Sequence, residues 1–261
     1  MKISSILLFS LLLLFAVPGL QAHHAQLPPG MSEPEAAWLW GYHTIPASIT
    51  RDNSAYWYNY AHSTDVHKIS NPAWTEVAAR HIKPGSKTPA VLVMHGCSGM
   101  FPSPNAYRVF FVERGFALLE PNSYARPGHA CETSPLQHRM EDMAYAVEKI
   151  RELPWVDQDR VVLMGISQGG RVVARWDKPG FAAHIILADN CDDGEPQAPA
   201  GTPVLAVVGE KDEYYKGSSC KVLKQHEASR SIVIPDAPHG IIDYEETADA
   251  MEVLLWQLDL L

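Results

Sequence analysis

Residues 160–176 read RVVLMGISQGGRVVARW, an apolar run followed by the motif Gly-x-Ser-x-Gly and a second run rich in valine. The pattern predicts a strand over 160–165 and a helix over 168–176. A tight turn between such a strand and helix lifts a serine hydroxyl out of the sheet, and glycines at 165 and 169 remove side chains that would clash there. Ser167 is therefore the candidate nucleophile of this chain.

Short apolar runs and helical stripes alternate on both sides of this motif. The predicted strands lie at 77–82, 90–95, 116–120, 182–188, 203–208 and 231–235. The predicted helices lie at 105–113, 137–153, 221–227 and 241–260. This alternation predicts an α/β fold with a mostly parallel sheet and helices on both faces. In such sheets, functional sites form beyond the carboxyl ends of the strands.

Two further strand ends carry the side chains that a serine nucleophile needs. Asp212 closes the segment GEKD after strand 203–208, and His239 lies in DAPHG after strand 231–235. A serine hydroxyl needs an imidazole to take its proton and a carboxylate to orient and stabilise that imidazole. We predict that Ser167, Asp212 and His239 form this triad, and a surface position of His239 is the alternative. The carboxylates that compete for the acid position are Glu210, Glu213, Asp192 and Asp193.

A glycine-containing turn, HGCSG at 95–99, follows the apolar run 90–94. A turn of this kind can aim backbone N–H groups at a developing oxyanion. We predict that the N–H of Cys97 is one donor and that the N–H of Gln168, at the start of the predicted helix, is the second. His95 is expected to brace this turn, and a plain loop is the alternative.

On these motifs, residues 76–261 resemble an α/β-hydrolase of the dienelactone-hydrolase-like group. The resemblance rests on His95-Gly96 after a strand, on the run 165–170, and on Gly209-x-x-Asp212 and His239-Gly240. It implies a sheet of about eight strands and hydrolysis of carboxylic esters through an acyl-enzyme on Ser167, with lactones as a further candidate. Dienelactone hydrolases proper use a cysteine nucleophile, so the resemblance does not carry their substrate over to this chain.

The partner that these residues imply is a small-molecule ester. No metal or organic cofactor is expected, because the cysteines and histidines show no ligand spacing such as CxxC. A serine peptidase or thioesterase would use the same residues and fold, and a non-catalytic binding protein on this fold is the alternative of a different class. The formal net charge of −9, from 30 acidic and 21 basic residues, argues against nucleic acid as a partner.

The N-terminus predicts export. Lys2 precedes the apolar run 6–17, and Ala22 offers a small residue for cleavage, so residues 1–22 are interpreted as a signal peptide cut after Ala22. The run is shorter than the ~20 residues that span a bilayer, and an uncleaved anchor is the alternative. We expect a secreted or periplasmic protein without a membrane span after cleavage. Residues 23–75 are expected to form an irregular extension and residues 76–261 the catalytic domain, without a large lid domain.

Export favours disulfides among the four cysteines. In the fold that the resemblance implies, the strand ending at 95 neighbours the strand ending at 120, and the strand ending near 188 neighbours the strand ending at 208. This order predicts bridges Cys97–Cys131 and Cys191–Cys220, both on the side of the active site. Four buried thiols are the alternative.

Loops on the same side of the predicted sheet carry candidate substrate contacts. These are Tyr124, Arg126, His129, Tyr214 and Tyr215. The guanidinium of Arg126 could pair with a carboxylate on the substrate. Ordinary decoration of a surface loop is the alternative for each of the five residues.

Overall fold

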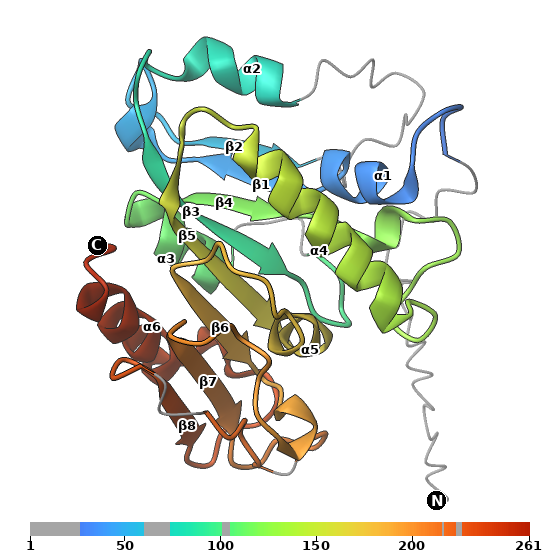
Figure 1. Ribbon diagram of the computed structural model, residues 1–261, viewed down its shortest axis with the longest axis vertical. Coiled ribbons are helices and arrows are strands. Elements are labelled where there is room, and N and C mark those ends of the chain that lie inside the picture. The colour runs from blue at the N-terminus through green and yellow to red at the C-terminus, as the bar shows by residue number, and fades with distance from the viewer. Residues whose placement is uncertain (1–26, 60–73, 101–104, 216, 223–225) are drawn as a thin grey trace, which may run out of the picture.

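A computed structural model describes residues 27–59, 74–100, 105–215, 217–222 and 226–261 (Figure 1). Its centre is one sheet of eight strands in the order β2-β1-β4-β3-β5-β6-β7-β8. The strands from β3 to β8 run parallel, whereas β1 pairs antiparallel with both β2 and β4. The predicted fold class, a mostly parallel sheet of about eight strands covered by helices, is confirmed.

The bounds of the strands follow the apolar runs of the sequence. The strands are β1 (Tyr42–Ile45), β2 (Tyr56–Asn59), β3 (Thr88–Met94), β4 (Ala117–Glu120), β5 (Val156–Ile166), β6 (Ala183–Leu187), β7 (Val204–Gly209) and β8 (Arg230–Ile234). All seven residues of β3 and all six of β7 are buried. Parallel strands covered on both faces read as continuous apolar runs, which is why the sequence predicts this part of the sheet well.

Helices cover both faces of the sheet (Figure 1). The helices are α1 (Glu33–Leu39), α2 (Trp74–His81), α3 (Ala106–Glu113), α4 (Leu136–Arg151), α5 (Gln168–Ala174) and α6 (Glu245–Gln257). Two apolar cores result, one with side chains of α1, α2, α4 and α5, and the other with side chains of α3 and α6. Strand β3 serves both, since Leu92 lies in the first core and Val91 and Val93 lie in the second.

The predicted strand 77–82 is wrong, because this segment lies in α2 and the turn after it. Trp74, Ala78 and Ile82 are all buried. The four-residue spacing of Trp74 and Ala78 puts both on one side of α2, and Ile82 follows the helix in an isolated bridge to Thr50. The predicted helix 221–227 is not seen either, since the described residues of that segment are not helical. In the closing segment 241–260, a short 3-10 turn (Ile241–Asp243) precedes α6.

The expectation of an irregular segment over 23–75 is also wrong for the residues that the structure describes. Helix α1 begins with a capping box between Ser32 and Glu35, and β1 joins the main sheet beside β4. The His43 ring in β1 stacks on Trp74, with 4.4 Å between ring centroids. Two short aromatic strands therefore extend the main sheet, and their length of four residues explains why the sequence pattern did not reveal them.

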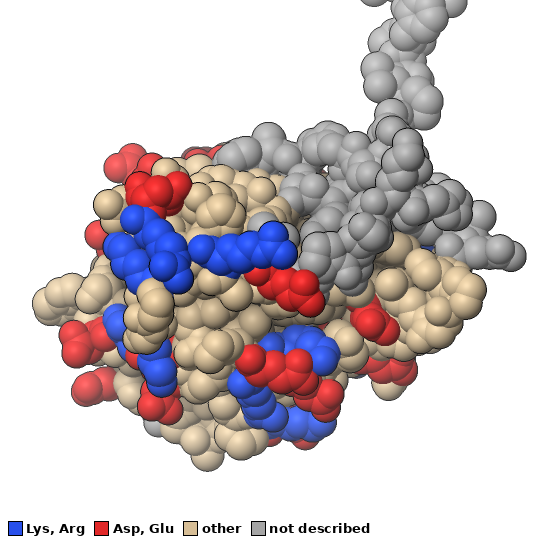
Figure 2. Space-filling model, turned by 90° about the horizontal axis from the view of Figure 1, so that it is seen from above, with Lys and Arg blue, Asp and Glu red and all other residues tan. Residues whose placement is uncertain are grey.

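The predicted signal peptide, residues 1–22, lies outside the described residues. Among the helices that the structure describes, none has the length and apolar character needed to cross a membrane. On the face shown in Figure 2, basic and acidic side chains lie beside one another. The charge of this face is therefore mixed in sign.

Candidate active site

Ser167 lies at a strained turn between β5 and α5. Its backbone has φ +55° and ψ −117°, a conformation that residues other than glycine rarely adopt. A Cβ on Gly165 would lie 2.2 Å from the oxygen of Gly169, and a Cβ on Gly169 would lie 1.9 Å from the oxygen of Met94. Only glycine fits at both positions, because position 165 lies against the start of α5 and position 169 lies against the end of β3.

The structure brings the three predicted side chains together from three strand ends. His239 Nε2 lies 2.9 Å from Ser167 Oγ, and His239 Nδ1 lies 2.7 Å from Asp212 Oδ2. Asp212 is buried, and its other oxygen accepts hydrogen bonds from the backbone N–H groups of Tyr214 and Tyr215 at 2.8 and 2.9 Å. These amides orient the carboxylate, so that one oxygen faces the imidazole.

The competing carboxylates are engaged elsewhere. Glu210 accepts a hydrogen bond from the backbone of Asp236, and Glu213 accepts one from the backbone N–H of His239, not from its ring. Asp192 pairs with Arg171 and Arg175, and Asp193 accepts from Ser218. Among the described carboxylates, only Asp212 bonds the ring of His239.

The turn 95–99, hereafter the His95 turn, lies against the serine. A Cβ on Gly96 would be 3.2 Å from the oxygen of Ile166 and 3.5 Å from Ser167 Cβ. The backbone N–H groups of Cys97 and Gln168 donate to no other group within the described part of the chain. Both amides are therefore free to bind an oxygen atom next to Ser167.

His95 is held as a neutral ring. Its Nε2 accepts a hydrogen bond from the backbone N–H of Ser123 at 3.0 Å, so Nδ1 carries the proton and donates to the oxygen of Gly96 at 2.8 Å. Burial, reinforced by the charge of Arg139, lowers the pKa of His95 to about 3. A ring with both nitrogens occupied cannot exchange protons with a substrate, so His95 braces the turn.

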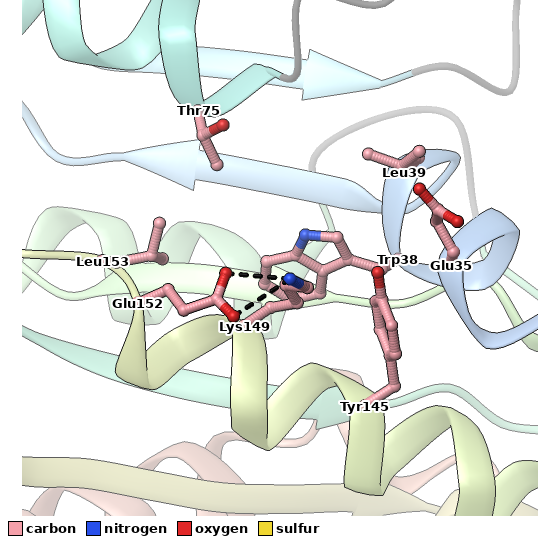
Figure 3. A pocket seen from close by; sticks show the side chains of 8 residues that line it. All are labelled: Glu35, Trp38, Leu39, Thr75, Tyr145, Lys149, Glu152 and Leu153. Atoms are coloured by element: carbon pink, nitrogen blue, oxygen red, sulfur yellow. Dashed lines mark hydrogen bonds and ion pairs between the residues drawn. The ribbon is translucent and has the colours of Figure 1, made fainter. Parts of the chain in front are cut away.

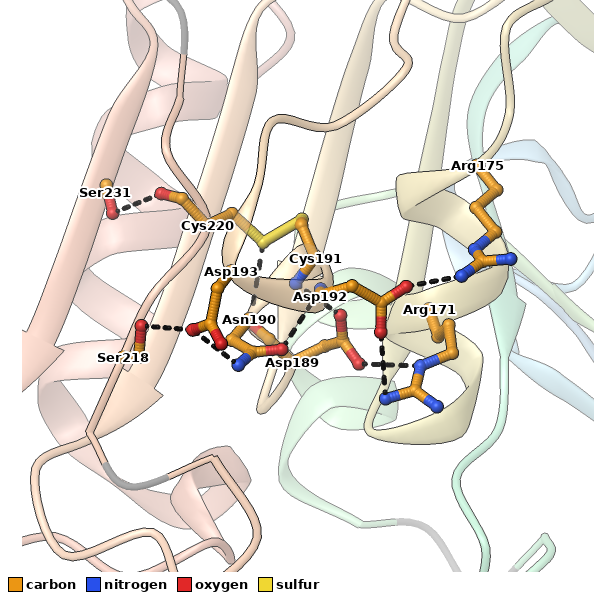
Figure 4. The surroundings of a disulfide bond; sticks show 10 residues. All are labelled: Arg171, Arg175, Asp189, Asn190, Cys191, Asp192, Asp193, Ser218, Cys220 and Ser231. Carbon is orange, nitrogen blue, oxygen red and sulfur yellow. Dashed lines mark hydrogen bonds and ion pairs between the residues drawn. A yellow bond between two sulfur atoms is a disulfide. The ribbon is translucent and has the colours of Figure 1, made fainter.

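Two disulfides lie at the carboxyl ends of the strands. Cys97 in the His95 turn is bonded to Cys131, with 4.6 Å between their Cα atoms. Cys191 is bonded to Cys220, with 5.0 Å between Cα atoms, and this bridge ties the acidic turn 189–194 after β6 to the segment after β7 (Figure 4). Asp189 Oδ1 accepts from the backbone N–H of Cys191 at 2.8 Å. Asp189 and these two sulfurs lie close together, but both sulfurs are committed to the disulfide.

The predicted substrate contact Arg126 is wrong. Its guanidinium is buried and bonds Asp142, Glu33 and Glu141, so acids from α1 and α4 occupy its donors. These contacts fasten the loop after β4 to both helices. The arginine therefore has a structural role.

Tyr124 and His129 are also turned into the protein. The Tyr124 hydroxyl donates to the backbone oxygen of Cys97 at 2.8 Å, and its ring lies against Gly99. The His129 ring stacks on His138, with 4.9 Å between centroids. Both residues are buried, and Tyr124 supports the His95 turn instead of facing an open pocket.

Tyr214 and Tyr215 lie beside His239. Their ring centroids are 4.6 and 5.8 Å from that of the imidazole. Tyr214 is 69% exposed, whereas burial, and then the nearby Asp189 carboxylate, raises the pKa of Tyr215. Of the five predicted contacts, these two border the triad, and only Tyr214 is open to solvent.

A hollow of about 270 Å³ lies between α1 and α4, away from the triad. In Figure 3, Lys149 and Glu152 face each other beside the indole of Trp38. The Lys149 Nζ lies 2.8 Å from the nearer Glu152 oxygen. None of its lining residues belongs to the triad or to the His95 turn, so this hollow is separate from the candidate active site.

Sequence reasoning missed Arg139. This residue of α4 is 1% exposed and donates to the backbone oxygen of His95 and to the side-chain oxygen of Gln168. A signal was present, because Arg139 precedes the buried residues Met143 and Ala146 of α4 by four and seven positions. An arginine in register with an apolar stripe is a candidate for burial.

A model of the dienelactone hydrolase family matches residues 77–252. Similar solved structures include Est1E from Butyrivibrio proteoclasticus, with 17% identity, coverage of 68% of this chain and 90% of that chain, and a TM-score of 0.45. Another is esterase 2 of Thermogutta terrifontis, with 13% identity, coverage of 69% and 86%, and a TM-score of 0.45. No match to a curated protein was found. The sheet and its helices form the α/β-hydrolase fold, and, since the family model spans more than half of the sequence, the chain belongs to the dienelactone hydrolase family.

Proposed function

We propose that this protein is an exported serine hydrolase that cleaves carboxylic esters through an acyl-enzyme. Ser167 is the nucleophile, His239 the general base and then acid, and Asp212 the acid of the triad. The observation that carries the proposal is the unbroken series of hydrogen bonds from Asp212 through His239 to Ser167. The hydrolase family of the chain supports the same reaction class.

The hydrogen bonds define the direction of proton transfer. A carboxylate can only accept, so His239 Nδ1 carries the proton toward Asp212, and Nε2 is free to take the proton of Ser167. Removal of that proton turns a weak nucleophile into one that can attack an ester carbonyl. Asp212 then stabilises the charged imidazolium that results.

The reaction proceeds in two halves. Ser167 Oγ bonds to the carbonyl carbon, and the carbonyl oxygen becomes an oxyanion that the N–H groups of Cys97 and Gln168 bind. His239 protonates the leaving alcohol, which departs as the carbonyl re-forms on the acyl-enzyme. In the second half, water gives a proton to His239 while its oxygen bonds to the acyl carbon. His239 then returns that proton to Ser167 Oγ as the bond to the acyl carbon breaks and the acid leaves.

A fluorophosphonate probe tests the nucleophile. We expect labelling of the wild type at Ser167 and none of Ser167→Ala, with hydrolysis of p-nitrophenyl esters lost in parallel. Ser218→Ala is the matched control, because Ser218 is a partly exposed serine that bonds Asp193 in the acidic turn. No labelling of the wild type, or equal labelling of Ser167→Ala, would reject the enzyme and leave the binding protein.

Matched ester, thioester and amide substrates with the same acyl group test the reaction class. We expect the ester to be cleaved fastest, with acyl chain length then varied to define the acyl group. Preferential cleavage of the amide or thioester would assign a peptidase or a thioesterase to the same residues.

We further propose that residues 1–22 direct export and are removed after Ala22. The two disulfides support an oxidising compartment. N-terminal sequencing of the protein recovered outside the cytoplasm should begin at His23. Retention of Met1 in the exported protein would instead indicate the uncleaved anchor.

A further inference from the structure

Arg139 is a buried cation in an unusual setting. It lies on α4 with 1% of its surface exposed. In the part of the chain that the structure describes, no carboxylate lies within ion-pair distance of it. Asp142, one turn along the same helix, pairs with Arg126 instead. A buried guanidinium without a carboxylate loses its hydration without the usual compensation, so its position calls for another explanation.

The donors of Arg139 reach both sides of the candidate oxyanion site. One guanidinium nitrogen donates to the backbone oxygen of His95, and the other donates to Gln168 Oε1 at 2.9 Å. The first contact fixes the peptide unit that leads into Gly96 and Cys97. The second fixes the side chain of Gln168, the residue whose backbone N–H follows the nucleophile.

These contacts close a ring around the site. Gln168 Nε2 donates to the backbone oxygen of Cys131 at 3.0 Å, and Cys131 is bonded to Cys97 by the disulfide. Cys97 is joined through Gly96 to His95, whose oxygen accepts from Arg139. The ring therefore runs from Arg139 through Gln168, Cys131 and Cys97 back to Arg139, and it includes both residues that are proposed to supply the oxyanion amides.

We propose that Arg139 is a positioning residue that holds the amides of Cys97 and Gln168 at the spacing required by the tetrahedral oxyanion. The inference rests on the proposed function. It gives a reason for the burial of a guanidinium that has no carboxylate partner among the described residues. The planar fork of arginine matches the task, because it donates to two acceptors in fixed directions, whereas a lysine ammonium on a flexible stem cannot hold both at once.

The physical basis is preorganisation. Amides that already point at the developing charge lose nothing to reorganisation during the reaction, and removal of one oxyanion donor costs about 10²–10³ in kcat. A donor that is displaced but still present should cost less. We expect Arg139→Lys to lower kcat by about 10–100-fold, by analogy with small misplacements of catalytic groups, with KM within about twofold of the wild type.

Three variants and a control test the proposal with a p-nitrophenyl ester and with the fluorophosphonate probe. The variants are Arg139→Lys, Gln168→Met and the double variant. Arg160→Lys is the control, since Arg160 also donates from its guanidinium to a backbone oxygen, that of Leu260, from the part of β5 before the turn. We expect a fall in kcat and in the labelling rate for both single variants, and none for Arg160→Lys.

The double variant decides whether Arg139 acts through Gln168. Both changes break the same ring, so the double variant should lose no more than about threefold beyond Arg139→Lys alone. Losses that multiply would overturn a common ring. A kcat for Arg139→Lys equal to that of Arg160→Lys would overturn the positioning role.

The same experiment distinguishes a variant that fails to fold from a failure of the proposed function and from a failure of the positioning role. Thermal unfolding of each variant shows whether it is folded, and Gln168→Met breaks the ring without changing a buried charge if Arg139→Lys fails to fold. A wild type that neither hydrolyses esters nor reacts with the probe would refute the proposed function. An active wild type with unaltered Arg139→Lys and Gln168→Met would refute the ring alone.

Discussion

The two disulfides anchor turns on either side of β5, but the surroundings of the two turns differ. Cys97–Cys131 lies in the His95 turn, where the hydrogen bonds to the turn come from Tyr124, Ser123 and Arg139 in the interior. Cys191–Cys220 links the acidic turn to residue 220, and Asp192 of that turn pairs with the half-exposed Arg171 and Arg175 (Figure 4). The first bridge joins a network of buried hydrogen-bond donors. The second has a buried sulfur at Cys220 and exposed ion pairs on the side of Asp192.

The backbone shows the same contrast. Cys191, Asp192 and Asp193 all have φ between +54° and +59°, whereas in the His95 turn only Gly99 has a positive φ. Non-glycine residues in this region cost roughly 1–2 kcal/mol each. The acidic turn is therefore a strained segment closed by a bridge, and the His95 turn is a relaxed segment surrounded by fixed donors. We infer that only the first bridge affects the geometry of the reaction.

The largest effect on kcat is expected for Asp212, and the buried carboxylate of Asp189 serves as the comparison. Asp212→Asn should lower kcat by about 10⁴, because the amide favours the wrong tautomer of His239. Asp189→Asn is the matched control and should leave kcat within about threefold, since its Oδ1 can still accept from Cys191. Steady-state kinetics at neutral pH measures both. Equal losses would show that Asp189 also acts on the triad.

Removal of each disulfide tests the contrast directly. The pairs of serine substitutions at Cys97 with Cys131 and at Cys191 with Cys220 open loops of 34 and 29 residues. Each should lower the free energy of unfolding by about 3–4 kcal/mol in the chain-entropy model. Only the first pair should also lower kcat, by about tenfold or more, as expected for a perturbed oxyanion site. Urea denaturation and kinetics give the two readouts, and equal kcat values would remove the distinction between the turns.

Acid should destabilise the folded protein through a buried histidine near the start of β6. Burial lowers the pKa of His184 in β6 to about 4, and neither ring nitrogen has a partner among the described residues. The unfolded chain binds a proton at this residue below about pH 6.5 and the folded chain does not, so stability is lost as pH falls from about 6.5 to 4. His184→Leu should reduce the loss between pH 7 and pH 4.5 by about 2 kcal/mol. Denaturation at pH 7 and pH 4.5 measures the difference, and an unchanged acid dependence would contradict it.

The smallest expected effect concerns the surface of the acidic turn. Arg175→Ala breaks an exposed ion pair with Asp192 and should lower the free energy of unfolding by less than about 1 kcal/mol, with kcat unchanged. The pair should also weaken in high salt. Denaturation at low and high ionic strength measures this, and a loss of several kcal/mol would mean that the ion pair holds the strained turn in place.

The most predictable strands are those whose burial is continuous. Every residue of β3, β4, β6 and β7 is buried, and these strands appear as apolar runs. The motif around Ser167 follows from a turn that only glycine permits. Strands β1 and β2 have four residues each, too few for a period to stand out. The helix α2 was mistaken for a strand because its buried residues are widely spaced along a short segment.

In the candidate site, too, some polar side chains could be placed from the sequence and others could not. The positions of Ser167, Asp212 and His239 after strand ends could be predicted, because the carboxyl ends of parallel strands share one edge of the sheet. Arg126 was misassigned because nothing in its local sequence reveals the acids on α1 and α4 that surround it. Arg139 was missed because a charged residue in a helix is exposed by default.

The amino-acid sequence is enough to predict the chemistry of the turns, the succession of buried strands and the residue types that follow each strand, since each of these depends on a few adjacent residues. The pairing of hydrogen-bond donors with acceptors from different elements is visible only in the folded protein. Arg139 and Arg126 are both arginines near the same strand ends, yet one bonds the His95 turn and Gln168 and the other bonds three carboxylates. The energy of a buried charge depends on its surroundings after folding, and no local pattern contains those surroundings.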